Sequence, residues 1–97
     1  MKPVEFSPEA LADLEGIGEY IGFENPSRAR SYVDEIYRKA LNVSTTPQAY
    51  PKRDDLRRDL RMAVHGLYLI LFRIGDEYVE IVRILHGARD LPRALDE

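Results

Sequence analysis

The chain has 97 residues, of which 44% are hydrophobic and 32% charged, and its 17 acidic residues outnumber its 14 Lys and Arg residues to give a formal net charge of −3 at pH 7. This length and composition fit a single domain, residues 1–97, and exclude a disordered chain. A protein that binds nucleic acid mainly through phosphates is usually basic, so we expect no direct nucleic-acid binding.

The sequence has no cysteine, which excludes disulfides and thiolate metal ligands. The N-terminus lacks the apolar run of a signal peptide, and no stretch approaches the roughly 20 apolar residues of a membrane span. Glycine-rich phosphate loops, HExxH, GxSxG and paired-carboxylate motifs are also missing. We therefore expect a cytoplasmic protein with no membrane association, no metal and no cofactor.

Val4 and Phe6 alternate with polar neighbours, which predicts a short strand, and Ser7-Pro8 then predicts the start of a helix. Ser7 would be the N-cap and Pro8 the first helical residue, where the N–H that proline lacks has no helical partner anyway. The helix extends to about Gly22. Apolar residues recur along it at helical spacing, at Leu11, Leu14, Ile17 and Ile21.

Asn25-Pro26 repeats this start signal, and a second amphipathic helix follows up to Thr45. Its apolar residues lie three or four positions apart, at Ala29, Val33, Ile36, Ala40 and Val43. The short connection predicts an antiparallel helical hairpin, whose apolar stripes must be covered by the rest of the chain.

The C-terminal half predicts three antiparallel strands after a polar loop at 47–58, at residues 60–64, 67–74 and 78–85. His65-Gly66 and the segment 75–77 supply the turns between them. The predicted fold is therefore α+β, in the order β-α-α-β-β-β, with the helical hairpin packed on one face of a small, largely antiparallel sheet.

The strand 67–74 is apolar on both faces. Its two faces are formed by Tyr68, Ile70, Phe72 and Ile74 on one side, and by Leu67, Leu69, Leu71 and Arg73 on the other. A sheet covered by helices on one side should expose polar residues on the other. Two explanations remain open: a partner covers the second apolar face, or the 47–58 loop or the C-terminus folds over it.

Arginines accompany the three predicted strands, at Arg57, Arg58, Arg61, Arg73, Arg83 and Arg89. Strand alternation would gather several of them on one face, where guanidinium groups suit phosphate or carboxylate. The alternative is a set of ordinary surface arginines paired with nearby carboxylates, those of Asp54, Asp55, Asp59 and Glu80.

The segment from His86 to Asp90, at the end of the last strand, is the most distinctive one. Histidine is a common general acid or base, but acid–base catalysis also needs a group that orients it and a nucleophile within reach. The alternative is structural, with His86 bonded to a backbone carbonyl and Arg89 paired with Asp90. We expect His65, in its turn, to be structural as well.

The order of elements, the Ser7-Pro8-Glu9-Ala10 start, the strand 68–72 and the ending 81–90 resemble the ParE/RelE toxin superfamily over nearly the whole chain. The ending Arg83-x-x-His86-Gly87-x-Arg89-Asp90 is the most specific part. It is similar to the closing strand of ParE toxins in particular.

This resemblance implies a toxin of a type II toxin–antitoxin system with one of two mechanisms. ParE-like members trap DNA gyrase on broken DNA by protein binding, whereas RelE-like members cleave messenger RNA in the ribosomal A site. The ribonucleases use basic residues and commonly a C-terminal aromatic residue; Arg61 and Arg83 match basic positions, but no tyrosine follows Arg89. The resemblance therefore favours a gyrase inhibitor without enzymatic activity. A ribosome-dependent messenger RNA endoribonuclease is the alternative, and a non-toxic antitoxin-binding module is a third.

The same resemblance implies a ParD-like antitoxin whose C-terminal segment folds on the toxin, with a helix in the groove of the hairpin and an extended piece near the sheet. The expected antitoxin contacts are Leu11, Leu14, Ile17, Ile21, Tyr68 and Phe72, although core packing is the alternative role of the hairpin residues. The expected toxic surface comprises Arg61, Arg73, Arg83, His86, Arg89 and Asp90, together with the C-terminal tail.

Overall fold

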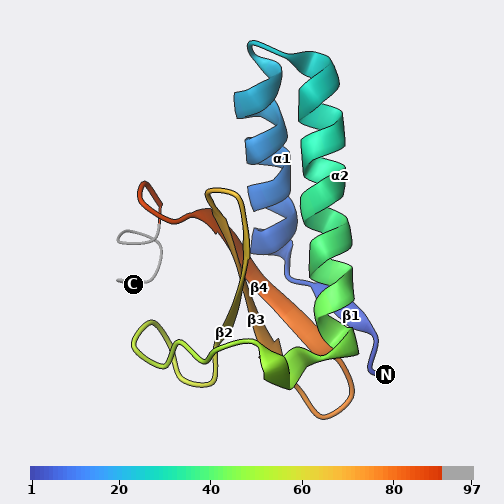
Figure 1. The fold of residues 1–97 in the computed structure, drawn as a ribbon, viewed down its shortest axis with the longest axis vertical. Coiled ribbons are helices and arrows are strands. Elements are labelled where there is room, and N and C mark those ends of the chain that lie inside the picture. Colours follow the sequence, from blue (N-terminus) through green and yellow to red (C-terminus); the bar gives the residue numbers. More distant parts are fainter. Residues whose placement is uncertain (91–97) are drawn as a thin grey trace.

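Two antiparallel helices lie side by side on one face of a four-stranded sheet in the computed structural model, which describes residues 1–90 (Figure 1). The elements are β1 (Val4–Phe6), α1 (Pro8–Gly22), α2 (Pro26–Asn42), β2 (Arg61–His65), β3 (Tyr68–Ile74) and β4 (Val79–His86). Short 3₁₀ turns occupy Val43–Thr45 and Pro47–Ala49. The predicted α+β class and order of elements are confirmed, and the expected contribution of the tail beyond Asp90 lies outside the described residues.

Both helices begin as the sequence predicts. The Ser7 hydroxyl oxygen accepts the backbone N–H of Ala10 at 3.0 Å, and Asn25 Oδ1 accepts that of Arg28 at 3.1 Å, with a proline at the first helical position each time. These bonds satisfy N–H groups that have no partner inside the helix. The second helix ends at Asn42 rather than Thr45, because Val43–Thr45 tightens into the 3₁₀ turn.

Glycines let the two helices approach each other closely. A Cβ atom at Gly18 would lie 3.3 Å from Val33 Cγ2, and one at Gly22 would lie 3.5 Å from the Cβ of Ala29. Glycine lowers the intrinsic stability of a helix by about 1 kcal/mol relative to alanine. At Gly18 and Gly22, close helix packing offsets part of that cost.

The strand order is β1-β4-β3-β2, with β1 parallel to β4 and the other two pairs antiparallel. Because β1 is so short, it pairs only with the first part of β4, from Val4 opposite Val79 to Phe6 opposite Ile81. The chain then turns directly into α1. The beginning of α1 therefore lies beside the second half of β4, whose outer edge β1 does not reach.

The sheet is apolar on both faces, as predicted, and the larger core lies under the helices. It contains the buried residues Ile36, Tyr68, Ile70, Phe72 and Ile81 among others. A second cluster on the opposite face contains Leu60, Leu71, Val82 and Leu85, with Leu56 and Met62 packed against it. Leu56 and Leu60 belong to the segment before β2, so the loop covers part of this face. On the same face, two residues of the β2–β3 hairpin remain exposed to solvent, Val64 (51% exposed) and Leu67 (69% exposed).

Candidate functional site

The second half of β4 and the facing side of α1 enclose a hollow of about 580 Å³. Its lining comprises Ala12, Asp13, Gly16, Ile17, Tyr20, Arg83, Ile84, Leu85, Arg89 and Asp90. Three of the residues expected on the toxic surface, Arg83, Arg89 and Asp90, therefore line one concavity, and His86 adjoins it.

A bidentate ion pair closes one side of this hollow. Arg83 donates from Nε and Nη2 to the two carboxylate oxygens of Asp13, at 2.8 and 3.0 Å. The pair is largely shielded, because 25% of the Arg83 side chain and 14% of the Asp13 side chain are exposed. The hydrogen bond with Asp13 raises the pKa of Arg83 above its usual value. Arg83 is therefore a permanently charged but already paired group.

The outer edge of β4 is completed by side chains where β1 no longer reaches it. The Ser7 hydroxyl donates to the carbonyl of Val82 at 2.7 Å, and the N–H of Ile84 donates to Asp13 Oδ2 at 2.9 Å. Farther along, the N–H of His86 donates to Asp90 Oδ2 at 3.0 Å. Backbone groups that would otherwise lack partners at a strand edge are thus satisfied.

The turn after β4 is held by His86, Arg89 and Asp90. The backbone N–H of Arg89 donates to His86 Nδ1 at 3.1 Å, and Arg89 Nε donates to Asp90 Oδ1 at 3.0 Å. The Arg89 guanidinium also lies over the ring of Tyr20, 4.9 Å from its centre. Hydrogen bonds from Arg89 and from the backbone of His86 lower the pKa of Asp90. The predicted Arg89–Asp90 pair is confirmed, whereas His86 accepts a backbone N–H instead of bonding a carbonyl.

A β-bulge in β4 sets the direction of these side chains. Leu71 pairs with Arg83 and Phe72 with Ile81, so Val82 is the extra residue. Without it, Ile81 and Ile84 would lie on opposite faces of the sheet, yet both belong to the core under the helices. Strict alternation, which the sequence analysis assumed, is therefore wrong for this strand.

Arg61 and Arg73 do not belong to this site. Arg61 Nη1 donates to the carbonyl of Tyr50 at 2.7 Å, which fastens the loop to β2. Arg73 is exposed and lies opposite Glu80, near the other end of β3. The expectation that strand alternation gathers these arginines on one face is wrong. Arg61 lies opposite Phe72, so the next residue along β3, Arg73, projects to the other face. Arg83 is bound by Asp13 at the outer edge of β4.

Four of the residues expected to contact an antitoxin are core residues. Leu14, Ile17, Tyr68 and Phe72 are at most 6% exposed and pack in the cluster under the helices. Ile21 is half-buried against the same cluster, and Leu11 is 51% exposed. For Ile17 the structure supports core packing, the alternative role considered for the hairpin residues. Leu14 packs in the same core but also lines the outer groove of the hairpin. For Tyr68 and Phe72 the expectation of a contact surface is wrong, because they face the helices.

The actual groove of the hairpin lies on its outer side, with a volume of about 590 Å³. It is lined by Leu14, Glu15, Gly18, Glu19, Ala29, Arg30, Val33, Asp34 and Tyr37. Of these positions only Leu14 was predicted from the sequence, because the prediction placed the apolar stripe of α1 in the groove and no residue of α2. The facing small residues Gly18, Gly22 and Ala29 were the available signal.

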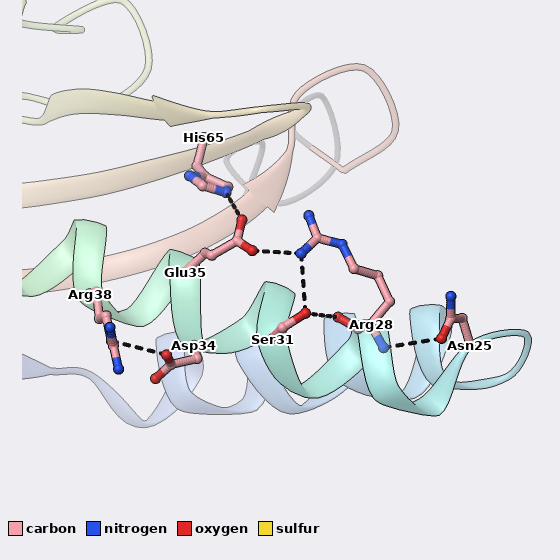
Figure 2. Close-up of polar contacts among 7 residues, drawn as sticks. All are labelled: Asn25, Arg28, Ser31, Asp34, Glu35, Arg38 and His65. Atoms are coloured by element: carbon pink, nitrogen blue, oxygen red, sulfur yellow. Dashed lines mark hydrogen bonds and ion pairs between the residues drawn. The ribbon is translucent and has the colours of Figure 1, made fainter.

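A second polar cluster connects α2 to the end of β2 (Figure 2). Glu35 accepts a hydrogen bond from Arg28 Nη1 at 2.6 Å and lies 3.2 Å from His65 Nε2 through its other oxygen. The bond from Arg28 is the main reason that the pKa of Glu35 is lowered. The ring of His65 also packs edge-on against Tyr32. These contacts agree with the structural role predicted for His65.

Within residues 1–90, no group of three or more His, Cys, Asp or Glu side chains is arranged to hold a metal ion. In the same part of the chain, the helices are too short or too polar to cross a bilayer.

Comparisons with known proteins agree with this architecture. Residues 4–91 match the model of the family described as the ParE toxin of type II toxin-antitoxin system, parDE. Toxin RelE2 of Caulobacter vibrioides is 37% identical over 94 residues, which cover 92% of this chain and 99% of the relative.

Two solved structures share the fold. One is from the chromosomal ParDE toxin–antitoxin system of P. aeruginosa, with a TM-score of 0.80 and 19% identity over 89% of this chain and 96% of that one. The other is from the toxin–antitoxin complex RelBE2 of Mycobacterium tuberculosis, with a TM-score of 0.62 and 26% identity over 88% of this chain and 96% of that one. With a family model that matches almost the entire sequence, the chain belongs to the ParE toxin family of type II toxin–antitoxin systems.

Proposed function

We propose that this toxin inhibits DNA gyrase by binding to it, and that a ParD-like antitoxin neutralises the toxin. The family assignment supports a toxin, and the end of β4 supports binding over catalysis. Arg83 is held by Asp13 and Arg89 by Asp90. Charged side chains that are already paired and oriented in the free protein suit recognition of a protein surface, because binding then costs little side-chain entropy.

The main observation against a ribonuclease is the hydrogen bond from the backbone of Arg89 to His86. His86 Nδ1 accepts the N–H of Arg89, so the neutral ring holds its proton on Nε2. Neither ring nitrogen is then available to take a proton from a ribose 2′-hydroxyl, as a general base must. The net charge of −3 also disfavours docking on ribosomal RNA.

Ribosome-dependent cleavage of messenger RNA is the second candidate. It is favoured by one observation, the name Toxin RelE2 of a relative that is 37% identical to this chain. Arg83 and Arg89 would then contact RNA phosphates, which requires that Asp13 and Asp90 release them.

The antitoxin, in this proposal, docks on the outer groove of the helical hairpin rather than on the core residues Ile17, Tyr68 and Phe72. Gyrase and ribosomes both lie in the bacterial cytoplasm, so the toxin acts there. Growth inhibition that an antitoxin reverses would also serve plasmid stabilisation if the gene pair is carried on a plasmid.

Gyrase supercoiling and DNA-cleavage assays with the purified chain test this function, with a translation assay on the same preparation. Inhibition of gyrase with intact messenger RNA supports the proposal. Cleaved messenger RNA with active gyrase would show that the toxin is a ribonuclease instead. Expression that is harmless without any antitoxin would indicate a non-toxic binding module instead.

A further inference from the structure

The outer groove between α1 and α2 has an apolar floor. Leu14, Gly18, Ala29, Val33 and Tyr37 form it. Gly18 contributes no side chain, so Val33 packs close to the backbone of α1 there, and Tyr37 is 40% exposed at one end. From Ala29 to Tyr37 the floor follows α2 for about 12 Å at 1.5 Å per residue, which accommodates about two turns of an added helix.

The margin of the groove along α1 is acidic. Glu15 and Glu19 line the groove four residues apart, so they project from the same side of the helix. Neither makes an ion pair with another residue in the stretch 1–90. Lys and Arg are absent from the sequence of α1, so this helix offers the two carboxylates no counter-charge of its own.

The margin along α2 carries the opposite charge. Arg30 and Asp34 line it, but Asp34 forms an ion pair with Arg38, whose Nε lies 3.0 Å from Asp34 Oδ2 (Figure 2). Within residues 1–90, Arg30 makes no ion pair. The groove therefore presents negative charge along one margin and positive charge near one end of the other.

We propose that this charge pattern selects the partner of the groove: an amphipathic helix with Lys or Arg on the side facing Glu15 and Glu19 and a carboxylate facing Arg30. Apolar contacts with the floor supply affinity, and the charges fix the orientation of the helix and reject segments with the reverse pattern. The inference rests on the proposed function, because this helix would belong to the antitoxin.

Two synthetic helical peptides test the pattern. They share leucines at i, i+3, i+4 and i+7 and differ only in the residues facing α1, which are Lys in one peptide and Glu in the other. We expect the basic peptide to bind at least about tenfold more tightly in calorimetry at low salt, a preference that salt reduces. Amide NMR shifts should change at Gly18 and Val33. Equal binding, tighter binding of the acidic peptide, shifts confined to another surface, or binding by neither peptide would overturn the proposal.

A charge reversal on the toxin supplies the matched test. The double variant Glu15→Lys/Glu19→Lys should prefer the acidic peptide, and it should fold because Lys and Glu have similar helix propensities. Glu9→Lys/Glu24→Lys makes the same change in charge outside the groove and should keep the original preference. If this control also reverses it, net charge rather than the groove determines binding. Gyrase inhibition by wild-type toxin without peptide is a separate readout, so either proposal can fail alone.

Discussion

The carboxylate of Asp13, near the start of α1, receives both hydrogen bonds that the guanidinium of Arg83 offers from β4. The same carboxylate accepts the N–H of Ile84. One side chain therefore joins the helical layer to the sheet and forms a wall of the hollow at the end of β4. Both the stability of the fold and the shape of the hollow therefore depend on Asp13.

Replacing Asp13 with alanine should lower the free energy of unfolding by about 2 kcal/mol, because it leaves a shielded guanidinium and a backbone N–H without their acceptor. Urea unfolding measures this loss. The control is Asp55→Ala, which removes an exposed pair with Arg53 and should cost less than about 1 kcal/mol. Equal losses in the two variants would show that Asp13 is no more important than a surface carboxylate.

Replacing Arg89 with alanine should relieve gyrase inhibition while leaving binding to the antitoxin groove intact. The substitution removes the guanidinium that lies over Tyr20 and pairs with Asp90, and none of these three residues lines the hairpin groove. Deletion of residues 87–97 should have the same two effects. The readouts are a supercoiling assay and peptide calorimetry.

Arg73→Ala is the matched control, because Arg73 is an exposed arginine outside the hollow. Full inhibition by the Arg89 variant, or loss of inhibition by the Arg73 variant alone, would contradict the placement of the toxic surface.

Asp90 should titrate below the usual range of aspartate, and Arg89→Ala should raise its pKa, because the Arg89 hydrogen bond is the main cause of the shift. Carboxyl NMR shifts measure both. A carboxyl pKa that is lower in the folded state contributes stability above the unfolded value, about 3.9, and this contribution is lost as pH falls through the folded pKa.

The destabilisation caused by Asp90→Asn should therefore be complete above about pH 4 and fade under more acidic conditions. Asp76→Asn, which removes one carboxylate charge in the turn before β4, is the charge-matched control. A constant effect of Asp90→Asn at every pH would argue against a charge-dependent contribution.

Alanine substitutions at two glycines should change the stability of the protein in opposite directions. Gly66 has φ of +59°, and a Cβ atom there would lie 2.6 Å from the Tyr32 hydroxyl oxygen. Gly66→Ala should destabilise the protein by more than about 1 kcal/mol. A Cβ atom added at Gly16 would meet nothing within 4 Å apart from its chain neighbours and the backbone of its own helix, so Gly16→Ala should stabilise α1 by about 0.5 to 1 kcal/mol. The unfolding temperatures of the two variants test this prediction. A change of the same sign in both variants would contradict it.

The fold was predictable because its signals are local. Ser7-Pro8 and Asn25-Pro26 mark the two helix starts through bonds that span only three residues. A nearly continuous apolar run located β3, and the short turns between strands predicted their antiparallel pairing. The resemblance of the 83–90 ending identified the family.

The site was less predictable because it depends on long-range pairing. The bulge at Val82 has no local signal, and the partner of Arg83 lies 70 positions away. The parallel pairing of β1 with β4, which brings α1 to this edge, also follows only from the complete topology. For the same reason, periodicity alone did not separate core residues such as Ile17 from groove residues such as Val33.

The carboxylates of Asp13 and Asp90 accept the N–H groups of Ile84 and His86 at positions where a neighbouring strand would place its carbonyl oxygens. A second molecule therefore finds no vacant backbone donors at these two residues for pairing edge to edge. Removing both carboxylates would create a template for aggregation on a sheet that is already apolar on both faces. The two acidic residues beside the site thus also protect this edge of β4 from pairing with another strand.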